Sequence, residues 1–374
     1  MYRAPGGTGR YTARIVSLLA HLFPGDSVIP FTAWHRSQDL LGAYRDFGLD
    51  QAHVPRPVVL GVPRPLLYDA WNRLAVPRLD FFKSFAGCDL VHAPSPAVPA
   101  TGKLPLVVTL HDAAFELFPE TYPRRGRRFH RLGVEAAAAR ADLVITVSES
   151  AAEEITTLTS ISRERLRVVP NGVDHVEATS GEIAETVEKY RLGGAPYVLW
   201  VGSLEPRKNV GMLVRAYARL VDEADIAHRL VLAGPVGWLA DDLISDVERA
   251  RLKDRIRLVG RVSEIELRAL YAAAEVFAFP SRHEGFGLPV LEAMVQGACV
   301  ICSDIGALRE VAAGAARFVP PSDVGAWVDN LGELLSQPKR RDELAAAGRI
   351  RADDFSWEAT VTATRAVYEE ALGG

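Results

Sequence analysis

Short apolar runs alternate along this 374-residue chain with segments whose apolar residues recur every three or four positions. Such alternation predicts strands and helices in turn, and therefore parallel α/β layers. The predicted strands of the N-terminal half lie near VIPFTAW, LVHAP, LPLVVTL, DLVITVS and RLRVVPNG. Those of the C-terminal half are YVLWVG, RLVLAG, RIRLVG, VFAFPS, CVICSD and ARFVPP. The chain is long enough for two domains, each with its own core.

Two stretches interrupt this alternation. After Asp174, the polar segment HVEATSGEIAETVEKYRLGGAP fits an interdomain connection with one helix, which predicts domains of residues 1–175 and 176–355. Residues 51–80 are rich in proline, and we expect loops there. The last segment, residues 356–374, has the pattern of a final helix.

Charge and cysteine content exclude several classes of protein. With 43 basic and 47 acidic residues, the net charge of −4 gives no overall attraction to nucleic acid. Cys88, Cys299 and Cys302 form no disulfide framework, and the lack of a second CxxC argues against zinc. We expect packed thiols in a reducing compartment. No apolar segment approaches the roughly twenty residues that span a bilayer and no signal peptide opens the chain, which predicts a cytoplasmic protein.

A basic segment is the exception to this balanced charge. Residues 123–131, PRRGRRFHR, place five arginines around Phe129 ahead of an alanine-rich helical pattern. Such a cluster favours peripheral contact with an anionic membrane surface. A solvated helix face explains it equally well.

The segment SRHEGFGLPVLEAM, residues 281–294, predicts a strand end, a glycine-bracketed loop and a helix that Pro289 opens. Glu284 falls in the loop, and Glu292 falls about one turn into the helix. The free amides and positive end of a helix attract anions. The amides in question belong to Gly285, Phe286, Gly287 and Leu288.

A carboxylate beside an anion site restricts the ligand, because it repels phosphate but accepts strong hydrogen bonds from hydroxyl groups. Glu292 is placed to bind the vicinal hydroxyls of a ribose, and Glu284 those of a second sugar beyond a diphosphate. This combination indicates a nucleotide sugar. The alternative is that Glu284 is a solvated loop residue and Glu292 a favourable charge near a helix start.

Residues 197–210, YVLWVGSLEPRKNV, predict a second strand and loop, followed by a helix. Ligands of open α/β sheets bind beyond the carboxyl ends of the strands, where Gly202 to Lys208 should lie. Arg207 offers a planar fork of donors and Lys208 a mobile charge, so the two could neutralise a diphosphate. A solvated surface pair is the alternative, although positive charge is unfavourable at a helix start.

These motifs, taken in order, resemble those of the retaining glycosyltransferases of family 4. The resemblance covers most of the chain and implies an α/β fold of two Rossmann-like domains facing across a cleft, the GT-B arrangement. It is carried by PGGTGRYT, VVTLHDAAFELFPETYP, VVPNGVD, VGSLEPRKN, LVGRVSEIEL and SRHEGFGLPVLEAM.

The resemblance implies roles for the residues of the C-terminal domain. By this resemblance Glu292 binds the nucleotide ribose and Glu284 contacts the transferred sugar. Arg207 and Lys208 then hold the diphosphate, and the loop around Arg261 and Val262 borders the base. The amides of Gly285, Phe286, Gly287 and Leu288 bind donor sugar hydroxyls and phosphate.

In the N-terminal domain, His111 matches the family's active-site histidine near the anomeric carbon. A histidine after an apolar strand is also a common structural residue. Gly7 and Gly9 match a glycine loop that closes onto the donor phosphates, although GGTG alone marks a turn just as well. The loops of residues 51–80 would shape the acceptor site, and the helix of residues 356–374 would pack back on this domain.

Two positions depart from the family pattern. Ser203 stands where many members carry an arginine, so phosphate neutralisation rests more heavily on Arg207 and Lys208. The glycine loop normally follows a buried strand, but only Met1 to Ala4 precede it here, and we expect that first strand to be missing.

The resemblance further implies that a hexose moves from a nucleotide-diphospho-sugar to a hydroxyl of a glycan or lipid-linked acceptor. Closure of the domains would exclude water. No cofactor or metal is implied, and GDP-mannose is the first choice of donor. Alternatives are a nucleotide-sugar 2-epimerase, which shares the architecture, and an inactive nucleotide-sugar-binding protein.

Overall fold

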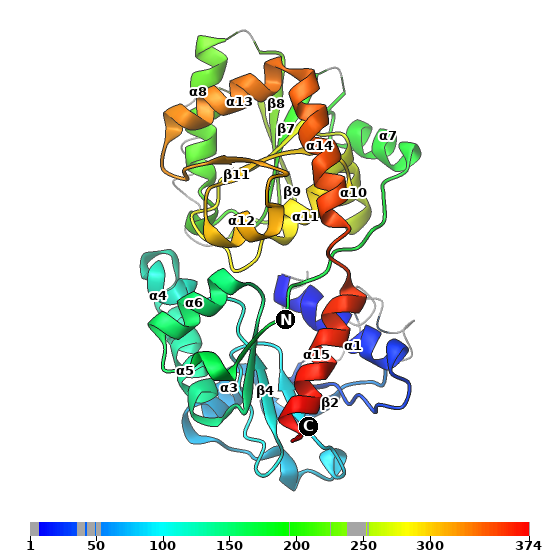
Figure 1. The fold of residues 1–374 in the computed structure, drawn as a ribbon, viewed down its shortest axis with the longest axis vertical. Helices are drawn as coiled ribbons and strands as arrows, with labels where there is room; N and C mark the ends of the chain where they lie inside the picture. Colours follow the sequence, from blue (N-terminus) through cyan, green and yellow to red (C-terminus); the bar gives the residue numbers. More distant parts are fainter. Residues whose placement is uncertain are drawn as a thin grey trace. The chain divides into compact units, whose positions relative to one another are not determined.

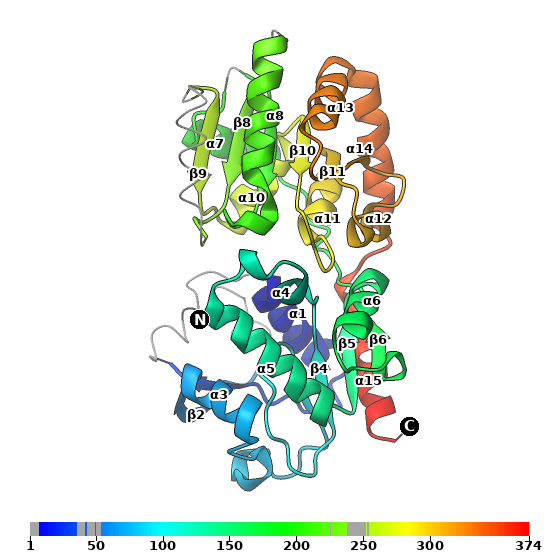
Figure 2. The same ribbon diagram turned by 90° about the vertical axis from the view of Figure 1, so that its left-hand side faces the viewer.

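The computed structural model describes residues 7–35, 42, 49, 54–193, 195–224, 226–237, 252 and 254–373. The chain forms two compact units (Figures 1 and 2). Unit 1 comprises the described residues of Met1–Gly172 together with those of Ser356–Gly374, and unit 2 comprises those of Val173–Phe355. The chain therefore passes between the units twice.

Unit 2 is built on a parallel sheet in the order β12-β11-β10-β7-β8-β9. The first three strands in the chain lie on one side of the sheet and the last three on the other, so the order reverses between β7 and β10. The strands are β7 Tyr197–Val201, β8 Arg229–Ala233, β9 Ile256–Gly260, β10 Val276–Phe279, β11 Cys299–Ser303 and β12 Arg317–Val319. All six match the apolar runs that predicted them.

The helices of unit 2 cover a sheet whose central strands are buried on both faces. Alternate residues of a strand point to opposite faces, and Val198 and Trp200 of β7 join the core formed with α8 and α13, where Tyr217 and Trp327 are fully buried. Leu199, between them, is also fully buried. The helices are α7 Ser180–Lys189, α8 Val210–Glu223, α10 Glu264–Ala272, α11 Leu288–Val295, α12 Gly306–Ala312, α13 Val324–Ser336 and α14 Pro338–Ala352.

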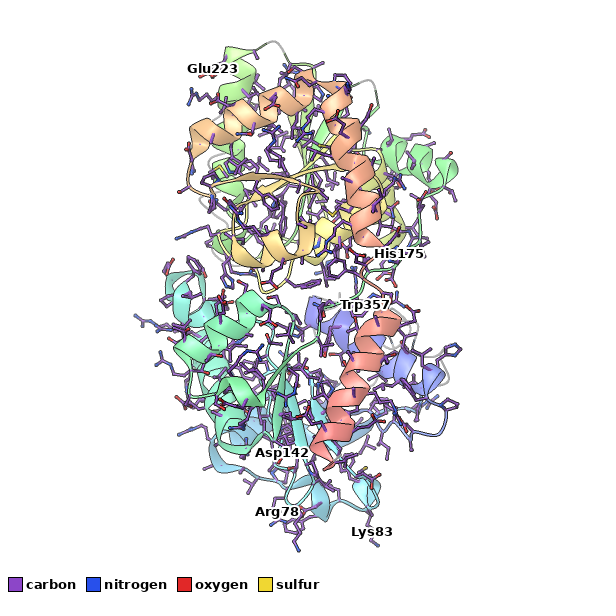
Figure 3. All side chains as sticks on the ribbon, viewed as in Figure 1. Arg78, Lys83, Asp142, His175, Glu223 and Trp357 are labelled. Atoms are coloured by element: carbon purple, nitrogen blue, oxygen red, sulfur yellow. The ribbon has the colours of Figure 1, made fainter. Side chains whose placement is uncertain are left out.

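Unit 1 contains two parallel sheets, β1-β2 and β3-β4-β5-β6. Its strands are β1 Phe31–Trp34, β2 Val58–Pro63, β3 Val91–Ala93, β4 Leu106–Thr109, β5 Leu143–Thr146 and β6 Leu166–Val168. Its helices are α1 Gly7–Leu22, α3 Arg64–Leu74, α4 Ala114–Leu117, α5 Arg124–Arg140, α6 Glu149–Leu158 and α15 Trp357–Ala371. Asp142, labelled in Figure 3, connects α5 to this sheet because its carboxylate accepts a hydrogen bond from the Leu106 amide at 2.7 Å.

The expectation of loops over residues 51–80 is wrong for the described residues 54–80. They contain β2 and α3, and Leu67 and Trp71 of α3 are buried in the unit 1 core. The prolines flank these elements instead of interrupting them. Pro63 precedes α3 and Pro65 lies in its first turn, where a proline ring removes no helical hydrogen bond.

The cysteines and the arginine-rich segment adopt ordinary environments. Cys299 and Cys302 are buried free thiols on β11, as predicted. In the arginine-rich segment, Arg131 and Arg127 contact Glu116 at 2.9 and 3.4 Å, whereas Arg124 and Arg125 are exposed. Membrane contact through this segment stays a prediction. In the part of the chain that the structure describes, no helix is long and apolar enough to cross a bilayer.

A buried hydrogen-bond chain joins α15 and α1 to the sheet of unit 1. The Tyr368 hydroxyl lies 2.6 Å from Nδ1 of His92, and Nε2 of His92 lies 2.8 Å from Oγ1 of Thr109. Thr109 is in turn 3.1 Å from the Tyr11 hydroxyl. Burial, with a smaller effect of the nearby His111, lowers the pKa of His92 to about 3, so the imidazole is neutral in the folded protein.

This neutral histidine predicts a loss of stability in acid. The unfolded chain protonates His92 near its ordinary pKa of about 6.5, whereas the folded chain does not until about pH 3. Stability is therefore lost as the pH falls below about 6.5, by about 2 kcal/mol at pH 5 from His92 alone. Urea unfolding at pH 7 and pH 5 measures this. The His92→Gln variant should lose less stability over the same interval, and an unchanged loss would contradict the assignment.

Candidate active site

The loops after β7 and β10 meet at the point where the strand order of unit 2 reverses. These strands are neighbours, with Val198 paired to Val276. Ligands of doubly wound sheets bind at such a switch point, beyond the carboxyl ends of the strands. The two loops are joined directly, because the Arg282 amide donates to the Arg207 carbonyl at 2.9 Å. Asn209 adds a second connection by donating to the Pro280 carbonyl at 3.0 Å.

The loop after β10 ends in the helix start that the sequence predicts. Helix α11 begins at Leu288, with Pro289 in its first turn. Gly287 precedes it with φ of 119°, a conformation that side-chain-bearing residues rarely adopt, and a Cβ there would lie 2.5 Å from Leu308 Cδ2. Glycine is therefore required at this position. Pro289 has no N–H and the Val290 amide donates to the Gly287 carbonyl at 2.9 Å, so the attraction of this end of α11 for an anion rests on the Leu288 amide and the positive end of the helix.

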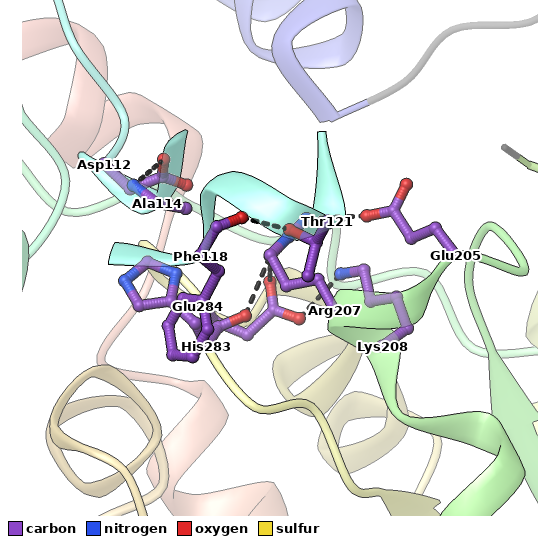
Figure 4. A network of polar contacts seen from close by, with 9 residues as sticks. All are labelled: Asp112, Ala114, Phe118, Thr121, Glu205, Arg207, Lys208, His283 and Glu284. Atoms are coloured by element: carbon purple, nitrogen blue, oxygen red, sulfur yellow. Dashed lines mark hydrogen bonds and ion pairs between the residues drawn. The ribbon is translucent and has the colours of Figure 1, made fainter. Parts of the chain in front are cut away.

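Four charged side chains converge beside this helix start (Figure 4). Nζ of Lys208 lies 2.6 Å from Oε1 of Glu284. Nη1 of Arg207 lies 3.3 Å from Oε2 of Glu284 and donates to the His283 carbonyl at 2.8 Å. The other Arg207 nitrogen, Nη2, pairs with Glu205 at 3.0 Å. Two cations and two carboxylates thus balance one another.

Burial strengthens the charge–charge interactions within this cluster, because little water is present to screen them. Glu284 is only 9% exposed and Glu205 only 6%. Burial would raise the pKa of Glu284, but the charges of Lys208 and Arg207 outweigh it and lower the pKa to about 2. Burial raises the pKa of Glu205 despite the same two cations. The alternative that Glu284 is a solvated loop residue is therefore wrong, as is that of a solvated pair for Arg207 and Lys208, which are 15% and 13% exposed.

Glu292 and Val262 lie on the same side of unit 2. Glu292 is half-buried in α11, where its Oε2 accepts a hydrogen bond from the Tyr271 hydroxyl at 3.1 Å. That bond fixes one carboxylate oxygen. Val262 is half-buried in the loop between β9 and α10, and Ser263 caps α10 by accepting from the Glu266 amide. Parallel strands place the loops after β7, β9 and β10 at one edge of the sheet.

In unit 1, His111 follows β4. Its ring meets that of Tyr11 edge-on, with centroids 5.1 Å apart. Burial lowers the pKa of His111, although Asp112 and a backbone hydrogen bond with Pro94 oppose the shift. Nε2 of His111 is buried and has no hydrogen-bond partner among the described residues. A buried imidazole nitrogen without a partner has unused capacity to bind a ligand.

Gly7 and Gly9 lie in the first turn of α1, so in the described residues they belong to a helix and not to a loop. The amides of a first helical turn remain available to an anion, and the predicted contact with donor phosphate stays a prediction.

Beside His111, unit 1 contains a cavity of about 280 Å³ that the sequence analysis missed. It lies beyond the ends of β3 and β4, which are neighbours in the sheet. Helix α5 contributes Phe129, His130 and Val134 to the lining. Val134 follows His130 by four residues, the spacing that places side chains on one face of a helix, and this spacing is a sequence signal for the cavity. The lining residues are Thr8, Ser95, Pro96, Leu110, His111, Asp112, Phe115, Tyr122, Phe129, His130 and Val134.

Solved structures with this fold are GT-B glycosyltransferases. HepE from Anabaena, solved with UDP and glucose, superposes with a TM-score of 0.75 at 19% identity over 99% of this chain and 97% of its own. WaaG, a glycosyltransferase involved in lipopolysaccharide biosynthesis, superposes with a TM-score of 0.65 at 16% identity over 96% of this chain and 95% of its own. The fold is thus of the GT-B class.

Sequence comparison gives the family. Residues 5–177 match the model of Glycosyltransferase Family 4, and residues 182–351 match that of Glycosyl transferases group 1. O-antigen chain mannosyltransferase B of Escherichia coli is 34% identical over 313 residues, 82% of this chain and 81% of the relative. MMP alpha-(1->4)-mannosyltransferase of Mycolicibacterium hassiacum is 33% identical over 285 residues, 72% of this chain and 66% of the relative. The chain belongs to the family 4 glycosyltransferases.

Proposed function

We propose that this glycosyltransferase moves a mannosyl residue from GDP-mannose to a hydroxyl of a glycan or lipid-linked acceptor, with retention of configuration. The observation that carries the proposal is the buried cluster of Arg207, Lys208 and Glu284 at the start of α11. It combines donors for a diphosphate with an acceptor for sugar hydroxyls. Few ligands other than a nucleotide sugar need both groups within a few ångströms.

Donor binding redistributes the contacts of this cluster. The diphosphate takes up hydrogen bonds from Lys208 and Arg207, which otherwise go to Glu284, and from the Leu288 amide at the start of α11. Glu284 then accepts hydrogen bonds from hydroxyls of the transferred sugar, and Glu292 from those of the ribose. The salt bridge between Glu205 and Arg207 stays in place when the donor binds.

The transfer itself breaks the bond between the anomeric carbon and the diphosphate oxygen, and forms one from that carbon to the acceptor oxygen. The proton of the acceptor hydroxyl passes to the departing diphosphate on the same face of the sugar. Negative charge grows on the diphosphate in the transition state, where preorganised donors stabilise it most. No side chain is required as a nucleophile, and Glu284 positions the sugar. The absence of a metal or other cofactor stays a prediction.

Mannose is proposed because both relatives described above are named as mannosyltransferases. The neighbour solved with UDP and glucose is only 19% identical. Its similarity therefore supports the fold of this chain, and its ligand gives no evidence for the base of the donor nucleotide. The rival activities, epimerisation of a nucleotide sugar and binding without turnover, have no observation in their favour.

A panel of radiolabelled nucleotide sugars, each incubated with the full chain and mannose-terminated acceptors, tests the proposal. Label from GDP-mannose should appear in the acceptor with retained configuration. Transfer from a UDP- or dTDP-sugar alone would overturn the choice of donor. Isomerised free donor would indicate an epimerase, and binding without turnover an inactive protein.

Glu292→Gln should weaken GDP binding by about tenfold to a hundredfold, because an amide replaces the charged acceptor of the ribose hydroxyls. Isothermal titration calorimetry with GDP measures the change. Tyr271→Phe, which removes only the hydroxyl that fixes Glu292, should have a smaller effect in the same direction. The exposed Glu343 of α14 supplies the control, Glu343→Gln. Equal affinities of the Glu292→Gln and control variants would remove Glu292 from the site.

A further inference from the structure

The cavity of unit 1 has the composition of a small-molecule site. It lies beyond the carboxyl ends of two neighbouring parallel strands, where open α/β sheets bind ligands. Its volume of about 280 Å³ is close to the lower limit of typical ligand pockets, about 300 Å³, and is suited to a single ring. Apolar and aromatic walls with a few polar groups are typical of such pockets.

Three aromatic rings surround one polar residue in this cavity. His130 stacks on Phe115 with ring centroids 5.5 Å apart and an interplanar angle of 23°. Phe129 and Tyr122 meet the same imidazole at steep angles, 76° and 72°, with centroids 5.5 and 5.7 Å away. The aromatic walls hold His130 in place and offer flat apolar surfaces to a ligand.

The polar groups of the cavity are neutral or negative. Burial lowers the pKa of His130, as it does that of His111, so both imidazoles are uncharged at neutral pH. A neutral imidazole has one donor and one acceptor, the combination that a hydroxyl needs. Asp112 adds a carboxylate whose Oδ1 accepts from the Ala114 amide at 3.1 Å. None of the described residues that line the cavity is a lysine or an arginine.

We propose that this cavity binds the reacting residue of the acceptor as an uncharged sugar ring, with His130 selecting it through a hydroxyl group. One apolar face of the ring would lie on the aromatic walls, and its hydroxyls would reach His130 and His111. The inference rests on the proposed transferase function and makes it more specific.

The charge of the cavity discriminates between acceptor classes. A phosphorylated acceptor, such as an inositol phosphate, would bring its anion next to the Asp112 carboxylate, and the described lining offers it no lysine or arginine, only the start of α1 at Thr8. Burying an unpaired anion is costly. A neutral hexose meets no such penalty, so the lining favours glycan acceptors.

Binding is tested first without any transfer, using saturation-transfer NMR on the full chain with methyl α-D-mannopyranoside and, separately, myo-inositol 1-phosphate. The ring C–H protons of the mannoside should receive saturation, and those of the inositol phosphate should not. Phe129→Leu keeps the apolar volume but removes a ring face, and should reduce the signal severalfold.

Kinetics test the role of His130 with the donor that the panel identifies. His130→Leu should raise the KM for the mannoside acceptor about tenfold, while the KM for the donor stays within about twofold. His130→Gln, which retains a donor and an acceptor, should restore part of the loss. His21 at the end of α1 is exposed and provides the matched control, His21→Leu. Thermal melting of every variant identifies any that fails to fold, in which case Phe129→Leu carries the test.

The outcomes distinguish a failure of the proposed transferase function from a failure of the proposed acceptor site. If no nucleotide sugar supports transfer, the proposed function fails, yet mannoside binding that depends on Phe129 would still support the cavity. If transfer proceeds but the His130→Leu and Phe129→Leu variants match the control in acceptor KM, the cavity is not the acceptor site. Preferential use of the inositol phosphate would overturn its assignment to a neutral sugar.

Discussion

Replacing Lys208 with alanine is expected to lower turnover by about 10²- to 10³-fold, while the affinity for the nucleotide diphosphate changes much less. The Lys208 side chain is 13% exposed, and its ammonium group lies between Glu284, at 2.6 Å, and the ring of Phe279, whose centroid is 5.2 Å away. A cation fixed in this way interacts most strongly with the charge that develops on the leaving diphosphate. Loss of one such preorganised donor typically costs two to three orders of magnitude in turnover.

Steady-state rates with saturating donor, together with calorimetric binding of GDP, measure the two effects separately. Lys208→Arg keeps the charge but not its position and should recover only part of the activity. Lys339, exposed in the first turn of α14, gives the control Lys339→Ala. If Lys208→Ala weakened GDP binding as much as it slowed turnover, Lys208 would contribute to ground-state binding and not specifically to the transition state.

The elements that the sequence predicts best are those buried on both faces of a parallel sheet. Strand β10 consists of apolar residues alone, its neighbour β11 is apolar up to the buried Ser303, and no exposed face interrupts the pattern. The helix start at Leu288 was predictable for a different reason. Glycine is favoured where the backbone has positive φ, as at position 287, and proline is favoured in the first turn of a helix, as at position 289. The two residues together therefore indicate where the helix begins.

The pairing of charges within the site was not predictable from the sequence. The cations at 207 and 208 indicated an anion, and the acid at 284 indicated hydroxyl groups, but their mutual contact depends on the adjacency of β7 and β10. Strand order is a tertiary property that local pattern does not encode. Glu205 was missed for a similar reason, since its loop packs closely against Gly237, where a Cβ would lie 3.4 Å from Glu205 Cβ, and no local pattern shows that contact.

The cavity of unit 1 shows more clearly what the sequence alone does not predict. Its lining extends from Thr8 to Val134 and comes from segments separated by up to 126 positions. Several of these segments belong to motifs named above, but no motif shows that they meet around one cavity. The arginines that surround Phe129 and His130 in the sequence indicated an exposed face of the helix. Only the packing of α5 on the strand ends shows which side of the helix is buried.

Gly133 sets that packing, and Gly133→Ala is expected to destabilise unit 1 by about 3 kcal/mol. A Cβ at position 133 would lie 2.0 Å from the Pro96 carbonyl oxygen, which already accepts a hydrogen bond from Asn72 at 3.0 Å. Backbone cannot yield as a flexible side chain does, so α5 must move away from the loop after β3. Because Pro96 lines the cavity, the same shift should enlarge it and raise the acceptor KM.

The helix contains its own control for this prediction. Gly126 lies in the first turn of α5, and a Cβ there would meet only Pro123 Cδ, at 3.9 Å. Gly126→Ala should therefore show the ordinary helix preference for alanine and stabilise by about 0.5 kcal/mol. Thermal melting should place the Gly133→Ala variant about 6–12 °C below the wild type and the Gly126→Ala variant at or slightly above it. Equal melting temperatures for the two variants would mean that α5 does not approach Pro96 this closely.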